Sequence, residues 1–231
     1  MFKNSLLLKT STTPVYTEDN PLITDGGRKL YRHDSDMGTV IEFNDGKNRK
    51  VLVLDAQYRA REIMMTSSST DTSLPNYSSK NTNSNWYIHG ARTSTNPSAC
   101  ASLSDATLNS LWAKSIDANT SKYNTDVWLT QPDCECATHC RSIKVNGVGC
   151  DIPNLQTLMR IYCEGVLLDE LDPTASSYPD LKLSRWFGGW YLWSSSEYNA
   201  DCVRLLYYEG VTINLSVYKY SARGVCPVLE L

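Results

Sequence analysis

The sequence predicts an α+β domain with two helices and a small antiparallel sheet, joined by many loops. Short segments rich in β-branched and aromatic residues occur towards both ends of the chain. Two central segments carry apolar residues at helical spacing, and stretches rich in Ser, Thr and Asn separate these elements. The chain has 231 residues, of which 41% are hydrophobic, so it can form one sizeable core.

The charge pattern favours neither nucleic acid nor a membrane as a partner. The net charge is −3, and acidic and basic residues are mixed, with no run of Lys or Arg. No apolar stretch is long enough to cross a bilayer, and Leu6–Leu8 is too short for the core of a signal peptide. We therefore expect folding in a reducing cytoplasm, where the eight cysteines need not form disulfides.

The N-terminal part is predicted to consist of an arm followed by a β-hairpin. Residues 1–37 are polar and rich in turn residues, which is typical of an arm or linker that orders against a partner. The main domain, residues 38–231, then begins with the strands Thr39–Phe43 and Lys50–Asp55 around a turn at Asp45–Gly46. Four consecutive apolar residues in the second strand predict burial on both of its faces.

Two helices are predicted in the middle of the chain. The first, Ser104–Ile116, is capped by its first residue and carries an apolar stripe at helical spacing. The second runs from Asn154 to about Asp169, with Asn154 as its cap and a proline before it. The polar stretch Ser67–Asn85 is predicted to be a loop, and Trp86–Ile88 a short strand after it.

The stretch from Trp186 to Leu231 is strongly aromatic and is predicted to contain a strand at Cys202–Tyr208. Alternate residues of a strand share a face. The face predicted to pack on the core carries Val203, Leu205 and Tyr207. The face predicted to be at least partly exposed carries Cys202, Arg204, Leu206 and Tyr208.

The segment Gly224–Leu229 is predicted to be the antiparallel partner of that strand. Pro227 cannot donate to the ladder, so it must lie at a bulge or face away from the neighbouring strand. Between the two strands, residues 211–223 are predicted to be a loop rich in Val, Ile, Leu and Tyr, which would be a sticky surface if exposed.

A motif in this stretch resembles a known family. The sequence WSSSEY at 193–198, the strand after it, Gly210 and the closing VCPV at 225–228 are similar to the end of the C-type-lectin-fold variable proteins of diversity-generating retroelements. The order of the upstream elements also fits, so the resemblance covers residues 38 to 231. It implies a C-type-lectin-like fold, related to formylglycine-generating enzymes, and a ligand-binding protein that is not an enzyme.

In that family, mutation at adenines diversifies positions near the C-terminus, while a scaffold stays fixed. The resemblance implies a variable region at about 186–228 and a displayed surface rich in tyrosine, which gives a large, rigid contact area. The implied ligand-binding residues are Tyr191, Leu192, Arg204, Leu206, Tyr208, Val211, Asn214, Leu215, Val217, Tyr218 and Tyr220. The implied scaffold residues are Trp193, Ser194, Ser195, Ser196, Glu197 and Gly210, together with Trp190, Glu209 and Lys219.

Many members of the family bind host receptors at the tips of bacteriophage tail fibres. The resemblance therefore implies a virion protein that folds in the bacterial cytoplasm, with the bacterial cell surface as the alternative location. Its partners would be a host cell-surface receptor, protein or glycan, and a tail-fibre or other virion protein bound through the arm. A homotrimer would suit a fibre tip, although no heptad repeat indicates one. The alternatives are a formylglycine-generating-type oxidase and an invariant structural fibre or adhesin domain.

One cluster has metal-ligand chemistry. Cys134, Cys136, His139 and Cys140 carry thiol and imidazole groups that suit tetrahedral zinc, but their spacing does not match paired Cys-x-x-Cys knuckles. Free thiols and disulfides are the alternatives to zinc, and we expect no metal and no cofactor.

Further residues could carry chemistry, but the sequence does not support a catalytic site. Cys202 and Cys226 are expected on adjacent strands, as a disulfide, as buried thiols or as a reactive pair. Formylglycine-generating enzymes use two cysteines that are close in sequence, so their catalytic role is not carried over to this distant pair. Hydrolase, phosphate-loop and zinc-protease motifs are absent, as are the motifs of calcium-dependent lectins.

Overall fold

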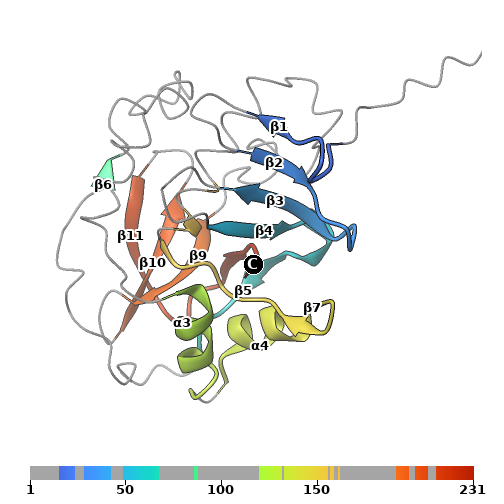
Figure 1. Cartoon of the computed structure of the whole chain (residues 1–231). Coiled ribbons are helices and arrows are strands. Elements are labelled where there is room, and N and C mark those ends of the chain that lie inside the picture. Colours follow the sequence, from blue (N-terminus) through green and yellow to red (C-terminus); the bar gives the residue numbers. More distant parts are fainter. Residues whose placement is uncertain are drawn as a thin grey trace, which may run out of the picture.

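The computed structural model describes residues 16–23, 29–42, 49–67, 86–87, 120–131, 133–155, 157–158, 161, 191–197, 201–207 and 212–231. These residues form a mixed α+β structure whose strands pair mostly in the antiparallel sense (Figure 1), as predicted. The predicted helix Ser104–Ile116 lies outside the described residues, and so does the predicted loop Ser67–Asn85 apart from Ser67 itself.

The first sheet has five strands, and all of its pairs are antiparallel. In spatial order, its strands are β1 (Leu22–Ile23), β2 (Lys29–Arg32), β3 (Gly38–Glu42), β4 (Lys50–Leu54) and β13 (Val228–Glu230). Figure 1 shows β1 to β4 side by side in this order. The predicted hairpin is confirmed as β3 and β4, and the apolar run Val51–Leu54 is buried throughout. At Gly38, an added Cβ would lie 2.1 Å from the carbonyl oxygen of Val53, so only glycine fits this close approach.

The predicted boundary at residue 37 is wrong, because part of the predicted arm belongs to this sheet. Strand β2 pairs with β3 along its whole length, and Leu30 and Tyr31 are buried. The guanidinium of Arg32 also pairs with the carboxylate of Asp55, with Nη2 2.5 Å from Oδ2. Only two apolar residues mark this strand, so its sequence resembled a polar linker. Residues 1–15 lie outside the described part of the chain.

The second sheet has six strands. In spatial order they are β5 (Ala60–Ile63), β12 (Arg223–Val225), β9 (Tyr191–Glu197), β10 (Cys202–Tyr207), β11 (Thr212–Tyr218) and β6 (Trp86–Tyr87). Among the described strands, β12 and β9 are the pair that runs parallel. The predicted strands at Cys202–Tyr208 and Trp86–Ile88 are confirmed as β10 and β6.

Two predictions about the C-terminal strands are wrong. The neighbours of β10 are β9 and β11, whereas the segment Gly224–Leu229 is divided between β12 and β13, which belong to different sheets. Much of the predicted loop at 211–223 is strand β11, whose Ile213, Leu215 and Val217 follow the two-residue period of a strand. Pro227 lies between β12 and β13, where its carbonyl oxygen accepts a hydrogen bond from the Leu54 amide at 3.2 Å. The same short segment thus joins both sheets.

Two short helices that the sequence did not predict precede the hairpin of β7 (Lys144–Val145) and β8 (Val148–Gly149). They are α3 (Ser121–Trp128) and α4 (Glu135–Ser142), and a 3₁₀ turn, η1 (Ala56–Tyr58), follows β4. Thr120 caps α3 by accepting a hydrogen bond from the Tyr123 amide at 3.1 Å. The predicted helix at Asn154 is confirmed at its start: Leu155 and Leu158 are helical and buried, and the Thr157 amide donates to Asn154 Oδ1 at 2.8 Å.

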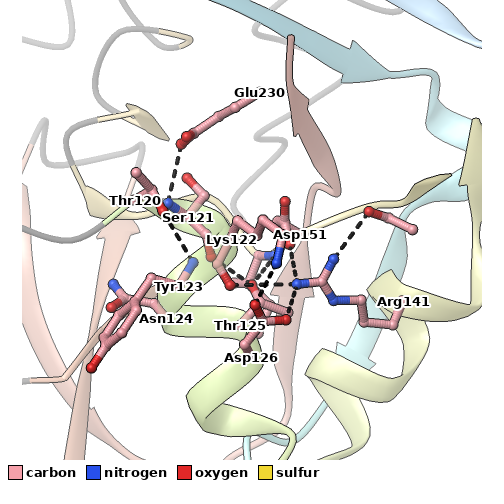
Figure 2. Close-up of polar contacts among 12 residues, drawn as sticks. Thr120, Ser121, Lys122, Tyr123, Asn124, Thr125, Asp126, Arg141, Asp151 and Glu230 are labelled. Atoms are coloured by element: carbon pink, nitrogen blue, oxygen red, sulfur yellow. Dashed lines mark hydrogen bonds and ion pairs between the residues drawn. The ribbon is translucent and has the colours of Figure 1, made fainter. Parts of the chain in front are cut away.

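An ion pair connects the two helices, and a hydrogen bond joins α3 to β13 of the first sheet (Figure 2). Arg141 of α4 lies between two carboxylates, with Nη2 2.5 Å from Asp126 Oδ1 and 2.8 Å from Asp151 Oδ1. Glu230 of β13 accepts a hydrogen bond from the Ser121 amide at the start of α3. Burial raises the pKa of Asp151 to about 6, although the charge of Arg141 opposes this shift.

Candidate functional site

Two of the predicted ligand-binding residues form an exposed aromatic pair. Tyr218, at the end of β11, is 53% exposed, and Tyr220, in the turn that follows, is 46% exposed. Their rings stack with centroids 5.2 Å apart and planes inclined by 13°. The Ser221 amide donates to the Tyr218 carbonyl at 2.9 Å and closes the turn. We call Tyr218 and Tyr220 the tyrosine pair.

The predicted exposure of three other residues is wrong. Arg204 and Leu206 of β10 are each 1% exposed, and Leu192 of β9 is also buried. Strand β10 lies in the interior of the sheet with both faces covered, so alternation does not separate a core face from a solvent face. Leu192 packs closely on the backbone of Gly224, where an added Cβ would lie 2.9 Å from Leu192 Cδ2.

The remaining predicted ligand-binding residues do not extend the tyrosine pair into one patch. Val217 and Tyr191 are half-buried against the core cluster that contains Trp128 and Trp193. The strand register places Tyr191 and Tyr218 at opposite ends of the sheet formed by β9, β10 and β11. Asn214 and Leu215 belong to β11, in a stretch whose side chains the structure does not describe. Tyr208 and Val211, like the predicted scaffold residues Trp190, Glu209 and Gly210, lie outside the described residues.

The WSSSE part of the motif lies within β9 and is buried over its whole length. Each of its serine hydroxyls bonds to a different segment: Ser194 Oγ donates to the Arg204 carbonyl at 2.8 Å, and Ser196 Oγ accepts from the Leu155 amide at 3.0 Å. Ser195 Oγ accepts from the amide side chain of Asn124 at 3.4 Å. The motif is therefore a structural part of the sheet that holds two helices in place.

The two buried tryptophans in the described part of the chain, Trp128 and Trp193, also donate hydrogen bonds. Trp193 Nε1 donates to the Ile63 carbonyl at 2.7 Å, and Trp128 Nε1 donates to the Ser195 carbonyl at 2.9 Å. These bonds connect β9 with β5 on one side and with α3 on the other. Because each indole nitrogen has a partner, neither buried ring leaves an unpaired donor in the core.

Lys219 lies between the two exposed tyrosines, but its own side chain points into the core. Its exposure is 3%, and its Nζ lies 2.5 Å from Oε1 of Glu197, which is 1% exposed. The ammonium also lies 5.4 Å from the centroid of the Trp128 ring. Its backbone is held as well, because the Lys219 amide donates to Asp201 and its carbonyl accepts from Met65. The two tyrosines therefore flank a residue whose side chain and backbone are both held by contacts with the core.

The cysteines of the predicted metal cluster are free and buried in the core. Cys134, Cys136 and Cys140 belong to the start and the inner face of α4. Burial raises the pKa of Cys134 to about 12 and that of Cys136 well above its ordinary value, so both thiols are protonated. His139 Nε2 lies 3.1 Å from the Tyr58 carbonyl oxygen. Within the described ranges, no three His, Cys, Asp or Glu side chains group as metal ligands.

The predicted neighbourhood of Cys202 and Cys226 is wrong. Cys202 begins β10 and pairs with Tyr218, whereas Cys226 is buried between β12 and β13. Both are free thiols. The misplaced partner strand explains the error, because Gly224–Leu229 does not lie beside β10.

A pocket with a volume of about 610 Å³ lies beside β2 and the turn before β1. The lysine and the arginine that line it both form ion pairs within the chain. Lys50 pairs with Glu18 and Glu42, and Arg32 pairs with Asp36 and Asp55. The carboxylates raise the pKa of Lys50 above its ordinary value by hydrogen bonding to its ammonium. These ion pairs hold β2 and the neighbouring turns on the sheet, so we assign them a structural role.

Comparison with known proteins finds no matching family model, no matching curated protein and no matching solved structure. No helix in the described part of the chain is long and apolar enough to cross a membrane.

Proposed function

We propose that the protein is a ligand-binding domain with a C-type-lectin-like scaffold, and that it attaches a bacteriophage to a receptor on its host. The tyrosine pair is the observation that carries this proposal. These two large aromatic side chains lie at the surface, at the end of a largely buried sheet, and each is about half exposed to solvent. Side chains of this kind are the usual anchors of binding surfaces.

The rigidity of the pair supports a binding role. The rings are stacked on each other, and Lys219 between them is anchored in the core. Binding therefore freezes few additional torsions, which lowers the entropic cost of association. A flexible loop with the same two tyrosines would lose more entropy on binding.

The scaffold proposal rests on the WSSSE motif and its contacts. The motif is one of the features that resemble the variable proteins of diversity-generating retroelements, and its serines bond three separate segments. Under this proposal the protein is not an enzyme, it acts in the virion, and the N-terminal residues contact a tail-fibre protein. A reverse-transcriptase gene with a template repeat beside the coding gene would support diversification, and a locus without them would count against it.

The binding role can be tested with intact bacteria. Flow cytometry of the fluorescently labelled protein against a panel of strains identifies a binding strain, and variants are then compared on that strain. Replacing Tyr218 and Tyr220 together by Ala should lower binding at least tenfold. Tyr123→Ala is the matched control, because Tyr123 is 43% exposed on α3 and belongs to no predicted binding surface.

All variants should melt within a few degrees of the wild type, because half-exposed rings contribute little to the core. The proposal fails if the double variant binds as strongly as the wild type, or if Tyr123→Ala loses as much binding. It also fails if no strain in a broad panel binds the wild-type protein.

A further inference from the structure

Arg223 is the first residue of β12, the strand that lies between β5 and β9. Its guanidinium carbon lies 5.0 Å from the centroid of the Tyr191 ring, which is the geometry of a cation–π contact. Both residues are half-buried, and their strands pair in register, with Gly224 opposite Leu192. The backbone of two paired strands therefore holds this contact in place.

Arg223 has no anionic partner among the described residues. Its Nη1 donates to the carbonyl of the preceding residue, Ala222, at 2.6 Å, and its Nε is buried without an acceptor. Other cations of the chain differ in this respect: Arg32, Arg141 and Lys219 each pair with at least one carboxylate. The charge of Arg223 is therefore available to a group from outside the chain.

An arginine held in this way suits an oxyanion. The guanidinium is planar and rigid, and its N–H groups match the two oxygens of a carboxylate or phosphate. The Tyr191 ring lies against the guanidinium, Nη1 donates to the Ala222 carbonyl, and Nε has no acceptor among the described residues. Because the side chain is ordered before an anion arrives, binding costs little conformational entropy.

We propose that Arg223, supported by Tyr191, is a subsite for a carboxylate or phosphate group of the ligand. The inference rests on the proposed function, because it assigns the subsite to the same ligand. Arg223 follows Tyr220 by three residues, so their Cα atoms lie at most about 11 Å apart. Tyr191 lies at the opposite end of the β9–β10–β11 sheet from Tyr218, so a ligand that reaches both sites carries a ring or apolar face for the tyrosine pair and, towards the Tyr191 end, an acidic group for Arg223. Tyr191 then acts by positioning Arg223.

The subsite can be tested by NMR titration of the purified protein with two probes, inorganic phosphate and sodium acetate. Sodium chloride keeps the ionic strength constant, and the backbone amide of Gly224 reports binding. The wild type should show saturable shifts with at least one probe, and the two titrations show which oxyanion is preferred. Arg223→Gln should weaken binding at least tenfold, and Arg223→Lys should weaken it about threefold, because lysine keeps the charge but not the planar pair of donors.

Two matched comparisons separate the subsite from general charge effects. Tyr191→Leu removes the ring and should weaken anion binding about two- to fivefold, whereas Tyr191→Phe keeps the ring and should bind as the wild type does. Lys29→Gln removes the same charge from the other sheet and should leave the titration unchanged. The proposal is overturned if the wild type shows no saturable shift, or if Lys29→Gln weakens binding as much as Arg223→Gln.

The cell-binding assay distinguishes this proposal from the proposed function. If the tyrosine-pair variant still binds cells but the phosphate or acetate titration depends on Arg223, the anion site stands and the proposed function fails. If the tyrosine pair is needed on cells but Arg223→Gln binds them as strongly as the wild type, the subsite is refuted and the proposed function stands. Loss of cell binding in both variants supports both proposals.

Discussion

Separating Lys219 from Glu197 should destabilise the protein far more than removing both charges together. The ammonium and the carboxylate lie 2.5 Å apart, and both side chains are almost completely buried. Lys219→Met removes the ammonium from the buried carboxylate of Glu197, and Glu197→Leu removes the carboxylate from the buried ammonium of Lys219. Removing one member of a buried pair costs about 3–5 kcal/mol.

For a chain of this size, about 1 kcal/mol shifts the melting temperature by roughly 2–4 °C, so each single variant should melt about 6–20 °C lower. The double variant, Lys219→Met with Glu197→Leu, replaces both charges by apolar groups of similar volume. Its stability should lie within about 1–2 kcal/mol of the wild type, because two desolvation penalties disappear with the attraction.

Thermal and urea unfolding, followed by circular dichroism, measure these differences. A double-mutant cycle then gives the coupling free energy between the two residues. The reasoning is refuted if both single variants are as stable as the wild type, or if the double variant loses the sum of the two single losses. Either result would mean that the ion pair is not desolvated as the structure indicates.

Three further predictions concern other parts of the core. Burial raises the pKa of Asp151 from 3.8 to about 6, so the stability that its protonated form contributes is complete below the unfolded pKa and is lost as the pH rises through about 6. The difference in unfolding free energy between wild type and Asp151→Asn should therefore change by about 2 kcal/mol between pH 4 and 6.5. Gly38→Ala should cost about 2 kcal/mol or more in urea unfolding, because its Cβ would meet the Val53 carbonyl; a loss under 0.5 kcal/mol would contradict the close approach. In mass spectrometry after iodoacetamide treatment of the folded protein, Cys202 should be alkylated before Cys136, and the reverse order would disprove the burial of α4.

Local signals made parts of the fold predictable from the sequence. The hairpin of β3 and β4 combines β-branched residues with a turn sequence, and the cap at Asn154 needs only neighbouring residues. Helix α3 was missed because its inner face is largely polar. The buried residues of this helix have helical spacing, but only one of them is a large apolar residue: Ser121, Asn124, Thr125 and Trp128. A search for apolar periodicity does not detect such a stripe.

The candidate site depended more on non-local structure. Tyr218 and Tyr220 were predicted as ligand-binding residues and are exposed, but Arg204 and Leu206 are buried because other parts of the chain cover both faces of β10. Strand alternation shows which residues share a face of the strand, but it does not predict whether another part of the chain covers that face. Arg223 could not be singled out from the sequence, because the lack of an anionic neighbour among the described residues is a property of the folded chain.

The pairing of β4 with β13 also has a consequence for a gene that is diversified. Val53 lies opposite Val228, which is 228 − 53 = 175 positions later in the sequence. The proposed variable region, at about 186–228, ends where β13 begins, so a shifted reading frame or a premature stop within it would remove β13 and leave β4 without its outer partner. Under the proposed function, gene copies with frame errors would therefore encode proteins that fail to fold. Copies with substitutions at exposed positions would still encode folded proteins.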